Sequence, residues 1–300
     1  MPAPLLMVLA TFLFATMGVC VKLASEFYAA SEIVMYRGLV GMAMTAFISR
    51  QRGLSLRTAL PGMHLWRSIS GVTSLCLWFY AIGKLPLATA MTLNYMSSVW
   101  MALFLLGGAV LLGAQRLDWK LMASVLLGFV GVALILRPTL DQQQLWHGLA
   151  GLLSGMLAAM AYLQVTALGR AGEPELRVVF YFSAGGAIAG AAVTAVTQGG
   201  LQWHSAWGAT LLLAVGLLAT TAQLSLTRAY STGKPLVNAC LQYLGIVFSF
   251  VYGMLLFKDA LTLSATVGML LIIGAGLAAT LLRNKAAPPP KDSQFNPAES

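Results

Sequence analysis

The chain has 300 residues, of which 59% are apolar and only 9% are charged, and it carries a formal net charge of +9. Soluble domains have about a quarter of their residues charged, so this composition argues against a soluble enzyme, a nucleic-acid-binding domain or a secreted disulfide scaffold. The excess of Lys and Arg is instead expected to mark the cytoplasmic side of a membrane protein.

Ten apolar segments, each long enough to cross a hydrocarbon core about 30 Å thick, follow one another along the chain. Membrane strands would be shorter and would alternate in polarity, so the segments are expected to be helices. The sequence therefore predicts an all-α integral membrane protein with ten transmembrane helices. The predicted helices are 4–23, 31–49, 66–84, 88–113, 118–137, 146–168, 176–197, 206–228, 235–257 and 261–282.

Positive charges are concentrated on one side of these helices. With a cytoplasmic N-terminus, thirteen of the 18 Lys and Arg residues, including Arg57 and Arg67, fall in cytoplasmic segments, and four fall outside. This bias predicts that both termini are cytoplasmic, in a multi-pass protein of the cell (inner) membrane. Residues 285–300 are Pro-rich and then polar, so they are expected to form a disordered cytoplasmic tail.

The two halves of the chain resemble each other weakly but in the same order. Leu93-Asn94-Tyr95-Met96 matches Leu241-Gln242-Tyr243-Leu244, and Val34-Met35-Tyr36-Arg37 aligns with Val179-Phe180-Tyr181-Phe182. Because each half contains an odd number of helices, the second copy must enter the membrane from the opposite side. We therefore expect two inverted five-helix repeats, 1–143 and 144–284, an arrangement characteristic of secondary transporters with a site at the repeat interface.

Polar residues inside the predicted helices are the candidates for substrate binding. Asn238 and Gln242 lie on one face of the helix 235–257, and Asn94 occupies the position equivalent to Gln242 in the helix 88–113. For any one of these side chains, a hydrogen bond that joins two helices is an equally good explanation. The mirrored amides favour a central cavity. The residues expected to bind the solute are Arg37, Asn94, Tyr95, Ser98, Tyr162, Gln223, Asn238, Gln242 and Tyr243.

Arg37 is the most informative of these residues, because it lies about 9 Å into a predicted helix, where an unpaired cation is costly. Its side chain could extend to the headgroups or pair with Glu32, but we favour a cation that faces the cavity and attracts an anionic group. Apart from Glu32, the predicted helices contain no Asp or Glu. This absence argues against a proton-coupled exporter of cationic drugs and favours a neutral, zwitterionic or anionic metabolite, such as an amino-acid-like compound or an organic acid.

Two alternatives belong to other functional classes. An intramembrane hydrolase could use Ser154, in Gly151-Leu152-Leu153-Ser154-Gly155, as its nucleophile. Such a serine needs a general base, yet His64, His147 and His204 all fall in loops or at helix boundaries, so we expect no catalytic residue. A channel or a membrane scaffold is the other alternative, although the rings of charge typical of channels are missing from the sequence.

The expected partners are a small-molecule substrate and the lipid bilayer, and not nucleic acid. We predict no cofactor and no metal site, because Cys20, Cys76 and Cys240 have the spacing of neither a zinc site nor a disulfide framework. The glycine pairs Gly107-Gly108 and Gly185-Gly186 could pack within the chain or against a second copy, so a homodimer is left open.

Several of these features resemble the drug/metabolite transporter superfamily, and specifically its EamA-type members. They are the five-plus-five arrangement, Arg37 in a Tyr-Arg-Gly motif, and Phe79-Tyr80-Ala81-Ile82 before a short Pro-containing turn. The resemblance covers roughly residues 4–283 and implies a ten-helix basket with cytoplasmic termini and a central substrate cavity. The chain departs from the family pattern at Ser97-Ser98, where many members have a Pro, and at Ala114-Gln115, where they have Gly-Glu.

Overall fold

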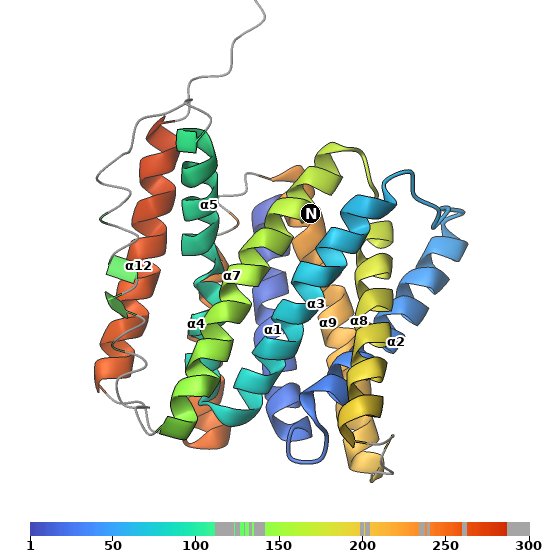
Figure 1. Cartoon of the computed structure of the whole chain (residues 1–300), viewed down its shortest axis with the longest axis horizontal. Helices are drawn as coiled ribbons and strands as arrows, with labels where there is room; N and C mark the ends of the chain where they lie inside the picture. Colours follow the sequence, from blue (N-terminus) through green and yellow to red (C-terminus); the bar gives the residue numbers. More distant parts are fainter. Residues whose placement is uncertain are drawn as a thin grey trace, which may run out of the picture.

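The computed structural model in Figure 1 describes residues 1–111, 142–198, 201, 205–233, 238, 241–259 and 263–286, with isolated positions between 123 and 134. The described residues form helices joined by short turns and contain no β-strand, which confirms the all-α prediction. Most of the predicted helix 118–137, the Ala114-Gln115 pair and residues 287–300 of the predicted tail lie outside them. The elements are α1 (Ala3–Ala24), α2 (Ala30–Gln51), α3 (Pro61–Lys84), α4 (Leu87–Tyr95), α5 (Ser97–Leu111), α7 (Gln142–Arg170), α8 (Glu175–Gln198), α9 (Ala206–Thr232), α11 (Leu244–Tyr252), the π-helical turn η2 (Gly253–Phe257) and α12 (Leu263–Ala286).

Five of the described helices, α1, α2, α7, α8 and α9, are long and apolar enough to cross a membrane. Large apolar side chains such as Ile188, Val196 and Leu270 are exposed on the bundle, as expected of a surface that faces lipid rather than water. Exposed tryptophans stand near the first residues of three helices, at Trp66 of α3 and Trp207 of α9 among them. Tryptophan is enriched at the two membrane–water interfaces, so these positions also suit an integral membrane protein.

Turn residues explain several helix boundaries. Gly172, with φ of 82°, ends α7 in a left-handed conformation that favours glycine, and Pro174 then precedes α8. Ser205 caps α9, because its side chain accepts a hydrogen bond from the backbone N–H of Gly208. The third helix begins at Pro61 rather than at the predicted residue 66, so it carries one more turn at its start.

Two helices that the sequence predicts as continuous are interrupted. The predicted helix 88–113 divides at Met96 into α4 and α5. The predicted helix 235–257 has a turn at Tyr243, after which α11 begins. The two interruptions fall within the Leu-polar-Tyr segments that align between the halves of the chain. Interrupted helices of this kind are common next to binding sites in transporters.

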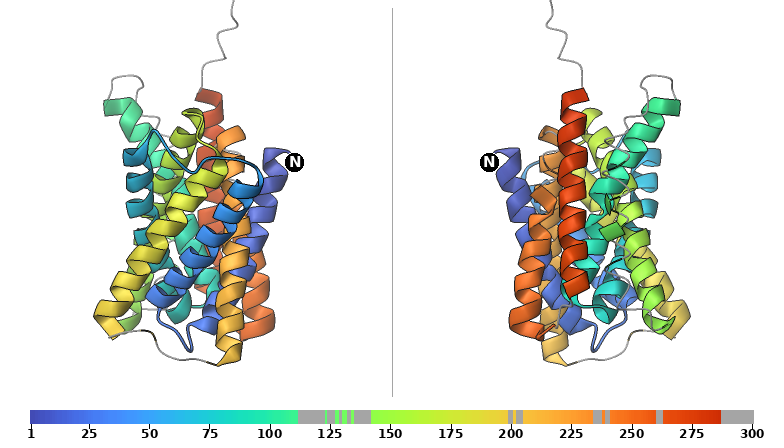
Figure 2. Two further views of the ribbon diagram at one scale, coloured as in Figure 1. Left: turned by 90° about the vertical axis from the view of Figure 1, so that its right-hand side faces the viewer. Right: turned by 90° about the vertical axis from the view of Figure 1, so that its left-hand side faces the viewer.

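The helices α2 and α8 pack closely and run antiparallel. Near the start of α2, a Cβ atom on Gly190 would lie 2.6 Å from the Ser31 carbonyl oxygen, and further along a Cβ on Gly38 would lie 2.6 Å from that of Ser183. Glycine at both positions therefore lets the two backbones approach. Around this pair, α1 packs on α9 and α3 packs on α7 (Figure 2).

The predicted glycine-rich faces are used differently. A Cβ on Gly185 would lie 3.0 Å from the Ser68 side chain, so this part of α8 packs inside the chain. A Cβ on Gly107 or on Gly108 would have no neighbour within 4 Å among the described atoms. The Gly185-Gly186 pair is therefore used for packing inside the chain, and the homodimer stays a prediction.

Arginines gather at one end of the bundle, which we call the Arg-rich end. Arg50 and Arg52 stand at the end of α2, Arg170 ends α7 and Arg177 begins α8. The opposite end, which we call the Lys22 end, carries Lys22, Lys84 and Lys258. The N-terminus and the C-terminal end of α12 lie together at the Arg-rich end (Figures 1 and 2).

Candidate substrate cavity

A central cavity lies where helices from both halves of the chain meet. The cavity leaves about 40 Å³ for the centres of water molecules. This is room for about three waters, so a larger solute can enter only if the helices move apart. The lining residues come from α1, α2, α3, α4, α7, α8 and α9 and are Phe14, Arg37, Arg67, Gly71, Ser74, Leu75, Trp78, Asn94, Tyr95, Ala158, Ala161, Tyr162, Phe182 and Gln223.

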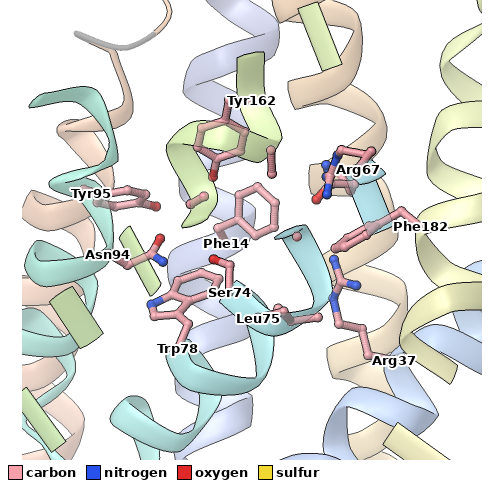
Figure 3. A pocket seen from close by; sticks show the side chains of 14 residues that line it. Phe14, Arg37, Arg67, Ser74, Leu75, Trp78, Asn94, Tyr95, Tyr162 and Phe182 are labelled. Carbon is pink, nitrogen blue, oxygen red and sulfur yellow. The ribbon is translucent and has the colours of Figure 1, made fainter. Parts of the chain in front are cut away.

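Arg37 faces this cavity. Its side chain is only 3% exposed, and its guanidinium carbon lies 5.0 Å from the centre of the Phe182 ring (Figure 3). It therefore does not extend to the headgroups. None of the ion pairs of the described residues involves Arg37.

Arg67 is the residue that sequence reasoning missed. The charge pattern places it in a cytoplasmic segment, but the structure places it inside α3, 3% exposed, with its guanidinium carbon 4.1 Å from the centre of the Phe182 ring. Its guanidinium folds back over Gly71, whose missing side chain leaves the space that Arg67 Nη1 occupies. Arg67 lies deeper in the helix than the sequence predicts, because α3 begins at Pro61, five residues before the predicted start.

The two guanidiniums lie on either side of the Phe182 ring (Figure 3). Their carbons are 5.0 Å and 4.1 Å from the ring centre, so they are at most 9.1 Å apart. At an effective dielectric constant of about 20, this separation implies a repulsion of about 2 kcal/mol or more. Each cation–π contact stabilises the structure by about 0.5–2 kcal/mol. Burying an arginine within a membrane helix costs more, about 2.5–3.5 kcal/mol. The contacts with the ring therefore do not offset the free-energy cost of burying two charges that also repel each other.

The polar groups that line the cavity without a hydrogen-bond partner are mainly donors. They are Nε of Arg37, Nε and Nη1 of Arg67, Nε1 of Trp78, the hydroxyl of Tyr95 and Nε2 of Gln223. Buried polar groups are nearly always paired, so an unpaired set in one place needs an explanation. The lining residues that the structure describes include no carboxylate. A cavity of this composition suits a solute that is rich in acceptors and negatively charged.

Asn94 reaches the cavity from the end of α4 and is held by α7. Its Nδ2 donates to Ser154 Oγ at 3.0 Å, and Ser154 Oγ donates to the Gly151 carbonyl at 2.6 Å. Ser74 Oγ in turn donates to the Ser154 carbonyl at 2.7 Å. Ser154 is thus part of a hydrogen-bond chain between helices and has no histidine or carboxylate beside it among these contacts. A nucleophile needs such a base, so the geometry does not favour the hydrolase.

Tyr95 and Tyr162 form another wall of the cavity, and both hydroxyl groups point inward in Figure 3. Tyr95 rests against Gly245 of α11, where a Cβ would lie 2.5 Å from its ring. Tyr162 stacks on Tyr230 with ring centres 5.4 Å apart. Gln242 is 1% exposed, and neither polar atom of its side chain has a hydrogen-bond partner among the described residues.

The structure therefore brings five of the nine expected residues, Arg37, Asn94, Tyr95, Tyr162 and Gln223, to one cavity. The other four are buried but are not among the lining residues; they are Ser98, Asn238, Gln242 and Tyr243. Asn238 donates to the carbonyl of Ala229, near the end of α9, at 2.5 Å. This hydrogen bond holds the segment that contains Asn238 against α9. No group of His, Cys, Asp and Glu that could hold a metal ion occurs in the described part of the chain.

A set of polar contacts joins the two halves of the chain at the Arg-rich end. Glu173, in the turn between α7 and α8, accepts from Thr58 at 2.7 Å and from Arg177 at 2.9 Å. Arg177 also donates to the Ser55 carbonyl at 2.9 Å. Although burial acts in the opposite direction, the hydrogen bonds from Thr58 and Arg177 bring the pKa of Glu173 below its usual value. We call this group the Glu173 contact.

A second set joins the halves at the Lys22 end. Lys22 Nζ donates to the Leu85 carbonyl at 2.9 Å and lies 3.8 Å from Asp259 Oδ1. Asp259 Oδ2 accepts from the backbone N–H of Leu87, the first residue of α4, at 3.1 Å. We call this group the Asp259 contact. Polar contacts thus join the two halves of the chain at both ends of the bundle.

Comparison with known proteins agrees with this architecture. Residues 1–137 match the EamA-like transporter family. The pseudopaline exporter CntI of Pseudomonas aeruginosa is 34% identical over 283 residues, covering 90% of this chain and 93% of that protein. A riboflavin transporter of Rhizobium johnstonii is 28% identical, covering 93% of this chain and 90% of that protein. A solved crystal structure shares the fold, with a TM-score of 0.68 and 19% identity over 93% of this chain and 97% of the other. The chain belongs to the EamA-like transporter family.

Proposed function

We propose that this protein is a secondary transporter that moves a small anionic metabolite across the membrane by alternating access through the central cavity. The observation that carries the proposal is the composition of that cavity. Among its described lining residues, the unpaired polar groups are mainly hydrogen-bond donors, two side chains are arginines, and none is a carboxylate. Such a site suits an organic acid, or an amino-acid-like compound with acidic groups, better than a cationic drug.

Alternating access requires that the two ends of the cavity open in turn. The Glu173 contact and the Asp259 contact each join a segment of residues 1–143 to a segment of residues 144–284, the two halves proposed as inverted repeats. Opening one contact while the other holds would admit the solute from one side. The interruptions at Met96 and Tyr243 supply places where helices could bend during this movement.

We propose that the Arg-rich end faces the cytoplasm, since cytoplasmic segments carry an excess of Lys and Arg. Both termini would then be cytoplasmic, in the inner membrane. A relative that is named as an exporter supports transport from the Arg-rich end to the Lys22 end.

The test is counterflow in proteoliposomes. Vesicles that contain the purified protein are preloaded with one unlabelled acid, such as glutamate, succinate or citrate, and diluted into a trace of the same labelled compound. A carrier accumulates label transiently and with saturation, whereas a channel lets it equilibrate without saturation. We expect saturable counterflow for at least one acid and its loss in Arg37→Gln. Folded protein that shows no saturable exchange with any of these acids would contradict the proposal.

A further inference from the structure

Two guanidiniums on the Phe182 ring restrict the chemistry of the solute further than Arg37 alone does. Arg37 belongs to α2 and Arg67 to α3, while Phe182 comes from α8, in the other half of the chain. We propose that Arg37 and Arg67 form one binding site for a solute with two anionic groups, one for each guanidinium. This inference rests on the proposed function, and it narrows the substrate class to dianionic acids.

The first argument is that one anionic group cannot serve both cations. The aromatic ring of Phe182 stands between the guanidiniums, 5.0 Å from one and 4.1 Å from the other (Figure 3). A carboxylate that forms a two-pronged contact with one guanidinium is therefore separated from the other by an apolar ring. A solute that neutralises both charges must extend past the ring edge and carry a second anionic group.

The second argument is that the described part of the chain supplies no counter-ion for either guanidinium. Nε of Arg37 and both Nε and Nη1 of Arg67 are buried without a hydrogen-bond partner. In the described part of the chain, no ion pair involves either residue. Truly buried charges in proteins are paired, so two unpaired cations beside one cavity point to a ligand that pairs them.

The third argument is that the position of Arg67 depends on a specific feature of the sequence. Its guanidinium occupies the place where any other residue at position 71 would carry its Cβ, so Gly71 allows Arg67 to lie along α3 toward Phe182. An arginine that served only to mark the membrane boundary would need no such space, because it would extend toward the headgroups.

The test compares acids that differ only in the number of charges. The thermal stability of the purified protein is measured in detergent against a series of unbranched dicarboxylates, from malonate to adipate, and against the monocarboxylate of equal length. Sodium chloride at the same ionic strength is the control for general salt effects. A ligand that binds the folded state raises the melting temperature with its concentration. We expect the best dicarboxylate to half-saturate this effect at a concentration about tenfold or more below that of its monocarboxylate.

Two variants make the comparison specific. Arg67→Gln should abolish the advantage of the dicarboxylate and leave the response to the monocarboxylate, because Arg37 remains. Lys84→Gln removes one charge from an exposed position and should behave like the wild type. Equal responses to both acids in the wild type, no response to any acid, or a dicarboxylate advantage that persists in Arg67→Gln would each overturn the proposal.

Counterflow separates this inference from the proposed function. Preferential binding of dicarboxylates without exchange in vesicles would uphold the two-cation site and contradict the carrier. Saturable exchange of a monoanion, with no preference for two charges and no effect of Arg67→Gln, would uphold the carrier and contradict the two-cation site.

Discussion

The substitution Gly71→Ala tests the cavity by moving one guanidinium without removing any charge. A Cβ at this position would occupy the space of Arg67 Nη1 and would lie 3.0 Å from Cε2 of the Phe182 ring. The first clash is with the end of a flexible side chain, so the helix can accept the methyl group if Arg67 turns away. We therefore expect a folded protein with a displaced Arg67.

The size of the effect follows from the contact that is lost. A hydrogen bond to a charged group contributes about 1.5–3 kcal/mol, and 1.4 kcal/mol corresponds to about a tenfold change in a binding constant. Gly71→Ala should thus weaken binding of the transported acid by about 10- to 150-fold. Replacing Gly by Ala within a helix favours folding by about 1 kcal/mol, so the melting temperature of the free protein should not fall.

Gly62→Ala is the matched control, since it adds the same methyl group to the same helix at a site with no neighbour within 4 Å. Both variants are reconstituted at equal density, and the concentration dependence of counterflow is measured together with the melting temperature of each. We expect a large increase in the half-saturating concentration for Gly71→Ala alone. If both variants transport with the same concentration dependence, the position of Arg67 has no part in binding and the reasoning fails.

Three further substitutions test other parts of the structure. Gly245→Ala places a Cβ 2.5 Å from the ring of Tyr95, and such overpacking should cost about 1–3 kcal/mol and lower the melting temperature. Ser154→Ala leaves the Asn94 amide without its hydrogen-bond partner and should destabilise the protein by about 1–3 kcal/mol, measured by thermal unfolding. Loss of a hydrolytic activity without a change in stability would instead favour the hydrolase. Glu173→Gln should lower the melting temperature at neutral pH. Because folding lowers the pKa of Glu173, its stabilising effect is complete above the pKa of the unfolded chain and disappears as the pH falls through the folded value, so variant and wild type should converge in acid; a constant difference would contradict this.

The sequence predicts the long helices well because their apolar runs end at charges and turn residues. The bounds of α1, α2, α8 and α9 differ from the predicted ones by a few residues at most. The prediction fails at the start of α3, where His64 and Arg67 resemble loop residues although both are buried. Hydropathy assigns charged residues to the outside of a membrane, and it cannot recognise a polar interior that accepts them.

The interruptions of the helices escape prediction for another reason. No Pro or Gly stands at Met96, so nothing in the local sequence indicates a break. The backbone carbonyls of Leu93 and Asn94 lie against Gly155 of α7, where a Cβ would be 2.6 Å from the first and 2.9 Å from the second. This contact depends on the packing of two helices that are far apart in the sequence, and the local sequence of one segment cannot reveal it.

Part of the cavity could be predicted, because a buried cation or amide within a membrane helix is rare enough to be noticed. This reasoning finds Arg37, Asn94 and Gln223, which the structure brings to the same cavity. It does not separate them from Asn238, whose amide holds the end of α9. Both kinds of residue satisfy the same rule, and only the position of their partners distinguishes a cavity residue from one that joins helices.

The place of the two guanidiniums also bears on how binding could drive movement. A ligand shifts a conformational equilibrium only by binding one state more tightly than another. Arg37 is next to Gly38, where α2 packs closely against α8, and Phe182 is next to Ser183 on the opposing face. When the cavity is empty and closed, two unpaired cations lie within 9.1 Å of each other and oppose closure. A dianionic solute that pairs with both guanidiniums removes that repulsion. The solute therefore binds the closed arrangement more tightly than an open, hydrated arrangement, in which water already screens the two charges. The charges that select the solute would therefore also supply the difference in affinity that an alternating-access carrier requires.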